Sequence, residues 1–388
     1  MQKPFDDIIY LDNNATTPLD PRVLEEMMPF LTSNFGNASS NHIAGVLANR
    51  AVNSAREKVA NLINSDPNEI VFTSGATEAI NLAIKGVVEQ YKEKGNHIVT
   101  AATEHPAVLD TCKYLEKKGV DVTYLPVNKY GLVDLTEVEK AIRQDTILVS
   151  VMLVNNETGV IQPIKEIAEL AHQKGVFFMT DATQAVGKMP INVNEMGIDI
   201  MAFSGHKFYG PKGVGGLYLR SRRPFKVKIE SLIHGGGHER GFRSGTLNVP
   251  GIVGLGAAAE IAIKEMVADQ LRIGALRDQM EKSFLEMPDT FLNGHPDKRL
   301  YNISNICFKG ADADAIIAGL ENIAVSNGSA CSSSKVEPSH VLTEMRLSES
   351  EAYSSLRISL GRFTSINEIK QFYHQLSNLI VSLRNFIS

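Results

Sequence analysis

The chain of 388 residues contains only three cysteines, Cys112, Cys307 and Cys331. A small and odd number of cysteines does not fit a disulfide framework of the kind that secreted proteins use, so we expect a reducing, cytoplasmic environment. The amino terminus also lacks the basic start and the apolar stretch of a secretory signal peptide, which supports the same expectation.

Long hydrophobic runs and an excess of positive charge are missing as well. No apolar stretch approaches the roughly 20 residues that a membrane-spanning helix requires, so we expect no membrane partner. The formal net charge of −5 disfavours a general nucleic-acid-binding surface, and we expect no direct binding of nucleic acid. With 43% hydrophobic and 21% charged residues, the composition is that of an ordinary globular enzyme, and the length favours two domains.

Several common cofactor and nucleophile motifs are absent too. The glycines at 210–216 are not in the Gly-x-Gly-x-x-Gly order of a dinucleotide-binding loop, and there is no P-loop. The His-Gly-Gly-Gly-His sequence at 234–238 resembles an esterase oxyanion loop, but no Gly-x-Ser-x-Gly motif accompanies it. These two histidines also lack a third ligand at suitable spacing, so no metal site is expected.

From about residue 69 to residue 220, apolar strand-like runs alternate with helical patterns. The runs are nearly continuous and rich in valine and isoleucine, as expected for parallel strands that are buried on both faces. Such alternation implies right-handed crossovers, and functional groups are then expected at the carboxyl ends of the strands. The expected strands are 69–73, 97–102, 120–127, 146–154, 176–180 and 198–203, and the expected helices are 77–91, 106–118, 135–142 and 164–174.

The pattern changes after Gly256, where a long helical segment begins that could connect two domains. The elements expected beyond this point are the helix 257–285, the strands 302–308 and 323–326, and a terminal helix 366–386. We therefore expect an α/β fold with a large domain of residues 15–256. Residues 1–14 and 257–388 are expected to form a smaller α+β domain.

Lys207 lies in the sequence Ser-Gly-His-Lys, directly after an expected strand and before a turn rich in glycine and proline, and Asp181 ends another expected strand. A lysine and a carboxylate at strand ends are the two groups that pyridoxal phosphate (PLP) requires from a protein. The lysine forms a Schiff base, and the carboxylate keeps the pyridine nitrogen protonated. Taken singly, the two residues are better explained as a surface lysine and a plain strand end, so the neighbouring segments decide.

Gly75, Ala76 and Thr77 open a helix directly after an expected strand. Free backbone N–H groups there, with a small residue and a hydroxyl, form either a plain helix cap or an anion site. Next to Lys207, a site for the cofactor phosphate is favoured. His105 lies where a strand gives way to a helix, and it either caps that helix or lies over the cofactor ring and transfers protons.

Cys331 lies among small polar residues in Gly-Ser-Ala-Cys-Ser-Ser-Ser at 328–334. Such neighbours are expected to make it exposed and mobile, which suits a nucleophile that must reach a substrate and then leave. Cys112 falls in a helical pattern and Cys307 in a strand, so both are expected to be inert packing residues. Arg357 lies in an otherwise apolar strand-like run and requires an anionic partner, for which a substrate carboxylate is one candidate.

Together these segments resemble the NifS/IscS-type group I cysteine desulfurases, which are PLP enzymes of aminotransferase class V with fold type I. The resemblance extends over nearly the whole chain, from Tyr-Leu-Asp-Asn-Asn-Ala-Thr-Thr at 10–17 to Gly-Arg-Phe-Thr at 361–364. Its other motifs are Thr-Ser-Gly-Ala-Thr-Glu at 73–78, Glu-His-Pro at 104–106, Val-Asn-Asn-Glu-Thr-Gly at 154–159, Asp-Ala-Thr-Gln at 181–184, Ser-Gly-His-Lys at 204–207, Arg-Ser-Gly-Thr at 243–246 and Gly-Ser-Ala-Cys at 328–331.

The resemblance implies roles in cofactor binding. Lys207 would carry the Schiff base, Asp181 would pair with the ring nitrogen, and His105 would stack on the ring and act in acid–base steps. Gln184 would bond the ring hydroxyl. The residues implied to contact the cofactor are Gly75, Ala76, Thr77, His105, Asn156, Asp181, Gln184, Ser204, His206, Lys207 and Thr246, with Thr77, Ser204 and His206 at the phosphate and Thr246 reaching the phosphate of a neighbouring subunit.

The resemblance also implies the substrate and the reaction. Arg357 and Asn156 would bind the carboxylate of L-cysteine, and the Cys331 thiolate would attack the substrate sulfur. The products would be L-alanine and a persulfide on Cys331, which passes its sulfur to an acceptor protein. A seven-stranded, mainly parallel sheet and a homodimer with shared active sites are implied in the same way.

The sulfur acceptor stays open, because an iron–sulfur scaffold, a tRNA-thiolation carrier and DNA phosphorothioation machinery all fit the residues that follow Cys331. Two other functions compete with desulfuration. A different PLP enzyme, such as a selenocysteine lyase or an aminotransferase, is disfavoured by the loop cysteine, since transamination needs no thiol nucleophile. A non-catalytic relative would have no reason to retain the lysine, aspartate, histidine and cysteine together.

Overall fold

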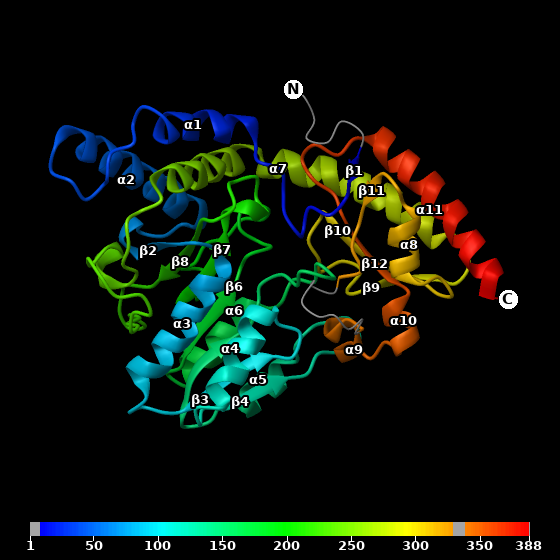
Figure 1. The fold of residues 1–388 in the computed structure, drawn as a ribbon. Helices are drawn as coiled ribbons and strands as arrows, with labels where there is room; N and C mark the ends of the chain where they lie inside the picture. Colours follow the sequence, from blue (N-terminus) through cyan, green and yellow to red (C-terminus); the bar gives the residue numbers. More distant parts are fainter. Residues whose placement is uncertain (1–7, 329–337, 388) are drawn as a thin grey trace.

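A seven-stranded sheet forms the centre of the larger part of the molecule (Figure 1). The computed structural model describes residues 8–328 and 338–387. The strands run in the order β2-β8-β7-β6-β5-β3-β4, and all neighbours are parallel except the two pairs that include β8. Their bounds are β2 (Ile70–Thr73), β3 (His97–Ala101), β4 (Asp121–Leu125), β5 (Thr146–Ser150), β6 (Phe177–Asp181), β7 (Ile200–Ser204) and β8 (Gly215–Leu219). The predicted α/β fold with a mainly parallel seven-stranded sheet is confirmed.

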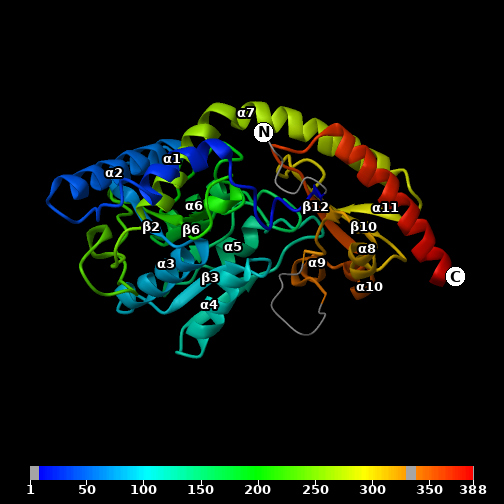
Figure 2. The ribbon, with the colours of Figure 1, turned by 45° about the horizontal axis from the view of Figure 1, so that its top comes forward.

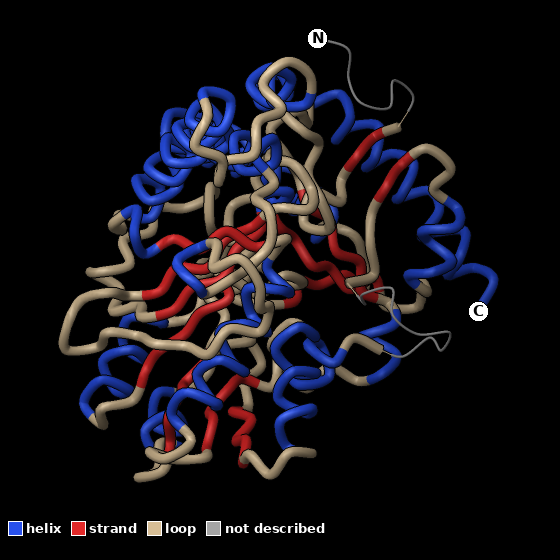
Figure 3. The backbone as a smooth tube through the Cα atoms, turned by 60° about the vertical axis from the view of Figure 1, so that its left-hand side comes forward, coloured by secondary structure: helices blue, strands red, loops and turns tan. Residues whose placement is uncertain are grey.

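Helices cover both faces of this sheet, and Figure 3 shows the strands as a band between them. Alternate side chains of each strand enter different hydrophobic clusters: Phe178 belongs to one, Met179 to the other. The first cluster includes α2 (Ile43–Ile63), α5 (Leu135–Ala141) and α6 (Ile164–Gln173), and the second includes α3 (Ala76–Tyr91) and α4 (Pro106–Glu116). Burial on both faces explains why the strands have no alternating polar pattern.

The remaining elements form a second layered unit. The strands β9 (Thr290–Asn293), β10 (Ile303–Phe308) and β12 (Ser355–Ser359) make an antiparallel sheet, and β1 (Ile9–Tyr10) pairs in parallel with β11 (Ile323–Ala324). A third hydrophobic cluster joins them to α8 (Ala313–Gly319) and α11 (Ile366–Ile387). The shorter helices α1 (Pro21–Leu31), α9 (His340–Glu344) and α10 (Glu349–Tyr353) complete the described structure.

The long helix α7 (Val249–Leu285) begins eight residues before the expected start at Ala257 and passes over both sheets (Figure 2). Pro250 is tolerated in its first turn, where backbone N–H groups need no helical partner, and Asn248 caps it by accepting from the backbone N of Gly251 at 3.2 Å. The glycines in its first turns permit close packing: a Cβ on Gly256 would lie 2.7 Å from Cα of Ala55 in α2. The expected division after residue 256 falls within this helix and stays a prediction.

Several strands end earlier than expected, among them β11, which stops at Ala324 rather than at residue 326. β5 stops at Ser150 rather than at residue 154, although the chain stays extended, with the N–H of Leu153 donating to the carbonyl of Asp181 at 2.9 Å. β4 likewise ends at Leu125 rather than at residue 127. In the part of the chain that the structure describes, we find no helix with the length and apolar character needed to cross a bilayer.

Candidate active site

A cavity of about 610 Å³ lies at the carboxyl ends of β6 and β7. It brings together every described residue that the sequence predicted for the site, with the exception of Thr246. These lining residues are Gly75, Ala76, Thr77, His105, Asn156, Asp181, Gln184, Ser204, His206, Lys207 and Arg357. Gly328 also lines the cavity, whereas Cys331 lies outside the described residues.

Lys207 ends the short turn Gly205–Lys207 that follows β7 directly. Its Nζ donates to the carbonyl oxygens of Asn14 at 2.6 Å and Ala15 at 2.8 Å. Burial lowers the pKa of this amine to about 8, and the nearby Arg357 charge adds to the effect, while Asp181 opposes it. A lysine with this pKa is partly neutral near pH 7.5, and the neutral amine is the nucleophilic form.

Asp181 is the last residue of β6 and is only 5% exposed. Its Oδ1 accepts from the backbone N of Thr183 at 2.9 Å. Within residues 8–328 and 338–387, no basic side chain forms an ion pair with it. Because a buried carboxylate without a counter-charge is costly, the site fits a partner that presents a cationic N–H group.

The N-terminus of α3 faces the same cavity. Gly75 is its N-cap, with φ of 154°, and no side chain caps the helix. The plain-cap interpretation of Thr77 is therefore wrong, because Thr77 lies inside the first turn. The backbone N–H groups of this turn, together with the positive charge of Lys212, provide a setting for an anion.

His206 shows the same positive environment. Burial lowers the pKa of its imidazole to about 4, and the charges of Lys207 and Lys212 contribute to the shift. Its Nδ1 lies 3.1 Å from Oγ1 of Thr16. The ring is therefore neutral at pH 7 and acts as a hydrogen-bonding group rather than as a cation.

His105 has one of the two roles that the sequence left open, that of a helix cap, and its role over the cofactor ring stays a prediction. It is the N-cap of α4, where its Nδ1 accepts from the backbone N of Ala107 at 3.1 Å, and it also lines the cavity. Burial is the main cause that lowers the pKa of its ring. Since Nδ1 is an acceptor in this bond, the proton of the neutral ring is assigned to Nε2.

Arg357 lies in β12 and reaches the cavity from the second sheet. Its Nη2 pairs with Oδ1 of Asp12 at 2.8 Å, and its Nη1 donates to the carbonyl of Asn156 at 3.2 Å. Among the described residues, its buried Nε has no hydrogen-bond partner. This Nε–H group is thus left over for a ligand acceptor. The sequence did not predict Asp12, whose partner is 345 positions away.

Thr246 does not line the cavity of its own chain. Its loop nevertheless reaches the rim, because Nε of Arg243 donates at 2.8 Å to Oε1 of Glu78, which lines the cavity. Thr246 as a contact to a neighbouring subunit stays a prediction.

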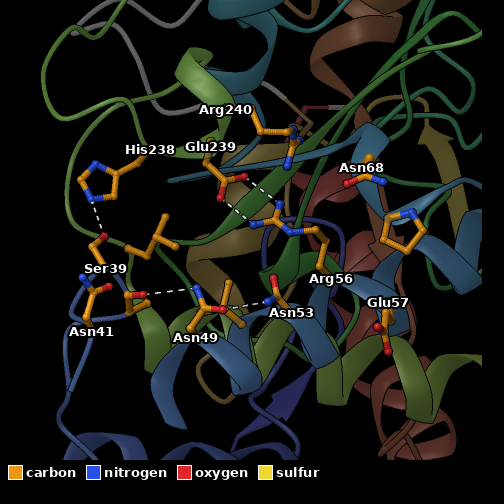
Figure 4. Close-up of a pocket in the computed structure, with 14 residues that line it drawn as sticks. Ser39, Asn41, Asn49, Asn53, Arg56, Glu57, Asn68, His238, Glu239 and Arg240 are labelled. Atoms are coloured by element: carbon orange, nitrogen blue, oxygen red, sulfur yellow. Dashed lines mark hydrogen bonds and ion pairs between the residues drawn. The ribbon is translucent and has the colours of Figure 1, made fainter. Parts of the chain in front are cut away.

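His238, from the glycine-rich segment, faces a second and larger cavity of about 870 Å³ (Figure 4). There its Nε2 lies 3.0 Å from Oγ of Ser39. That cavity contains none of the strand-end groups. In the described ranges, no three His, Cys, Asp or Glu side chains cluster in a way that could hold a metal ion.

Cys112 in α4 and Cys307 in β10 are both buried. Burial raises the pKa of the Cys112 thiol to about 12 and that of Cys307 to about 11. The reactive thiolate is therefore scarce at both positions, as the regular segments predicted.

Comparisons with known proteins agree on one family. The aminotransferase class-V family model matches residues 9–372. The curated cysteine desulfurase IscS of Pectobacterium carotovorum subsp. carotovorum (strain PC1) is 51% identical over 380 residues, which cover 97% of this chain and 94% of the relative. A solved NifS-like protein is similar, with a TM-score of 0.90 and 38% identity over 96% of this chain and 99% of that one. A structure of SspA in complex with cysteine matches with a TM-score of 0.81 and 40% identity, over 92% and 100% of the two chains. The chain therefore belongs to the aminotransferase class-V family and, within it, to the NifS/IscS-type group.

Proposed function

We infer that this protein is a cysteine desulfurase, which uses PLP to convert L-cysteine to L-alanine and transfers the sulfur to one of its own cysteines. The names of its curated relatives and the cysteine complex of SspA support this activity. The observation that carries the inference is one cavity that combines the Lys207 amine, the unpaired Asp181 carboxylate and Arg357. Gly328, three residues before Cys331, lies in its wall.

The donor set fits PLP group by group. The Lys207 amine would attach it covalently, the Asp181 carboxylate would bond the ring nitrogen, and Gln184 would bond the ring hydroxyl oxygen. The first turn of α3, with Thr77, Ser204 and His206, would hold the phosphate. When bound, PLP supplies an electron sink for the reacting substrate.

The substrate would be held by its carboxylate. The spare Nε of Arg357 and the Asn156 side chain are the groups we assign to this contact. The neutral ring of His105, with its proton on Nε2, is suited to move protons at the substrate. L-Cysteine would thus be oriented between Arg357 on one side and Lys207 on the other.

Sulfur transfer is assigned to Cys331. Its Sγ would attack the substrate sulfur as a thiolate, so that an S–S bond forms and the Cβ–S bond breaks. The substrate Cβ takes up a proton, and alanine and a persulfide result without an external oxidant or reductant. Cys112 and Cys307 are disfavoured because they are buried and have raised thiol pKa values.

We further propose a cytoplasmic homodimer in which Thr246 contacts the cofactor phosphate of the partner site. A large domain of residues 15–256 and a small domain of residues 1–14 and 257–388 remain part of this proposal. The persulfide would pass its sulfur to an acceptor protein, for which iron–sulfur assembly, tRNA thiolation and DNA phosphorothioation are the candidate pathways.

Mass spectrometry after brief exposure to L-cysteine tests the proposed function. We expect one additional sulfur atom on Cys331 and equimolar alanine during the first turnover. Cys331→Ala should still bind PLP and L-cysteine but should lose alanine formation by several orders of magnitude. Sulfur on Cys112 or Cys307 instead, or a loss of only a few-fold, would contradict the assignment.

A further inference from the structure

Lys188 is a buried lysine that contacts the cavity-lining residue Gln184. The proposed reaction does not use this lysine. It is 4% exposed and lies one helical turn after Gln184, in the turn that follows β6. Its Nζ donates to Oε1 of Gln184 at 2.9 Å. Within the described residues, no carboxylate forms an ion pair with it.

The neighbours of Lys188 are positively charged. Burial is the main cause that lowers the pKa of its amine to about 7, and the charges of Lys207 and Arg357 lower it further. An amine with one hydrogen-bond acceptor and two cations nearby gives little stability to a folded protein. An apolar side chain of the same volume would be buried at lower cost.

The contact does determine the orientation of the Gln184 amide. In its ammonium form, which dominates below about pH 7, Lys188 only donates, so the amide oxygen of Gln184 faces Lys188 and its nitrogen faces the other way. That nitrogen, Nε2, donates to the carbonyl of Asn14 at 3.0 Å. The same carbonyl accepts from Nζ of Lys207 at 2.6 Å.

Gln184 lines the cavity, and Nε2 carries two hydrogens. One of them is used by Asn14, so the second is left for an acceptor in the cavity. Without Lys188, only the bond to the Asn14 carbonyl would hold this orientation, and the amide would turn over more readily and present its oxygen to the cavity. The amide oxygen of Gln184 would then face the acceptor oxygen in the cavity, at a place where an N–H donor is required.

We propose that Lys188 is a positioning residue, which fixes the Gln184 amide so that its N–H points to the ring oxygen of the bound cofactor. The proposal rests on the proposed function, because it requires PLP in this cavity. It predicts that Lys188 matters for the electronic state of the cofactor and not for the stability of the fold.

The test compares Lys188→Met with the wild type. The thermal midpoint of the cofactor-free variant should equal that of the wild type or exceed it. In the PLP-loaded variant, the midpoint of the pH-dependent absorption change should rise by about one pH unit, because the oriented N–H donor to the ring oxygen is lost. Lys212→Met, which removes another lysine near the cavity, should shift the midpoint less.

Two further variants separate the outcomes. In a Gln184→Ala background, Lys188→Met should add almost no shift, since Lys188 acts through Gln184. In Lys188→Gln, the new side chain can still bond to Gln184, but it can accept as well as donate. The absorption midpoint should therefore rise less than in Lys188→Met.

A lowered thermal midpoint with an unchanged absorption midpoint would make Lys188 a structural residue, and so would loss of folding in both Lys188 variants. Either result would overturn the inference. Additive shifts in the Gln184→Ala background would overturn it too. A wild-type protein without a PLP absorption band would instead contradict the proposed function.

Discussion

The Arg56 guanidinium and the Glu239 carboxylate form a buried ion pair through two hydrogen bonds, of 2.8 Å and 2.6 Å (Figure 4). The pair also closes the outer edge of β2. Glu239 Oε2 accepts from the backbone N of Phe72 at 2.8 Å, and Arg56 Nη1 donates to the carbonyl of Ile70 at 2.8 Å. Because β2 is an edge strand of the large sheet, these contacts satisfy backbone groups with which another strand could otherwise pair.

Glu239→Ala should therefore destabilise the protein strongly, by about 3–5 kcal/mol, since it leaves the Arg56 charge buried without a partner. Thermal unfolding checks this, and light scattering should show increased association through the open edge. Glu260→Ala is the matched control: Glu260 pairs with Lys58 and Lys264 on the surface, and its loss should cost less than about 1 kcal/mol. Equal effects of the two substitutions would contradict the role of burial.

Lys207→Ala should abolish the absorption of covalently bound PLP and the release of alanine. Lys212→Ala removes a lysine from the lining of the same cavity and should retain the absorption, with weaker cofactor binding at most. Borohydride reduction followed by peptide mapping identifies the attached lysine. Attachment at Lys212 or Lys188 in the wild type would show that Lys207 is the wrong residue.

Arg357→Lys should lower kcat/KM for L-cysteine by about tenfold to a hundredfold, because the Nε–H group assigned to the substrate carboxylate is lost. The absorption of bound PLP should be unchanged. L-Cysteine methyl ester, which lacks the carboxylate charge, provides the comparison. The preference of the wild type for cysteine over the ester should collapse in the variant, and an unchanged preference would place the carboxylate elsewhere.

Stability should depend on pH through Glu157. Burial raises the pKa of this carboxyl to about 7, although the hydrogen bond from Ser339, at 2.5 Å, and the Arg357 charge oppose the shift. The folded state thus keeps a proton that the unfolded chain loses above about pH 4.5, so this group destabilises the fold as pH rises from 4.5 to 7. Relative to the wild type, Glu157→Gln should gain stability over this range, by up to about 3 kcal/mol.

Glu281 supplies a control, because its effect on stability should change with pH in the opposite direction. Burial opposes its ionisation, but hydrogen bonds from Arg299 and from Ser304, the latter at 2.5 Å, lower its pKa overall. Glu281→Gln should therefore lose stability relative to the wild type as pH rises through the range in which an unfolded glutamate ionises. Thermal midpoints from pH 4 to pH 8 measure both trends, and parallel trends in the two variants would refute the assigned pKa directions.

Shared active sites predict complementation between two inactive proteins. Lys207→Ala and a strongly impaired Thr246 variant, once mixed and allowed to exchange subunits, should form dimers in which one site carries both lesions and the other carries neither. Part of the alanine-forming activity should then return. No recovery, despite exchange demonstrated by differently tagged subunits, would confine Thr246 to its own chain.

Many residues around the cavity were predictable because they lie at strand ends, which can be recognised in the sequence and which a parallel sheet brings together. Asp181 ends β6, Ser204 ends β7 and Lys207 follows β7, and the carboxyl ends of such strands meet at one edge of the sheet. This prediction required only the positions of the strand ends. These are easy to recognise, because each apolar run is bounded by polar residues. The prediction was less accurate at β5, where four extended residues separate the strand from its polar groups.

Asp12 and the start of α7 were not predictable in this way. The Asp12–Arg357 pair joins segments that lie far apart in the sequence, and no local pattern signals it. Likewise, Gly254 reads as a helix breaker until its neighbour is known: a Cβ there would lie 2.6 Å from Sδ of Met27. Tertiary packing decided both features, and it overrides local propensity.

The length of α7 has a mechanical consequence for the cavity. At 1.5 Å per residue, the helix extends for about 55 Å. Its first turns pack beside the large sheet through Ile252, and its last turns pack beside the small one through Phe284. Lys207 follows a strand of the large sheet and Arg357 lies in a strand of the small one, so this continuous helix links the group proposed to hold the cofactor to the group proposed to hold the substrate. Movement of the two sheets relative to each other would therefore have to bend or roll α7.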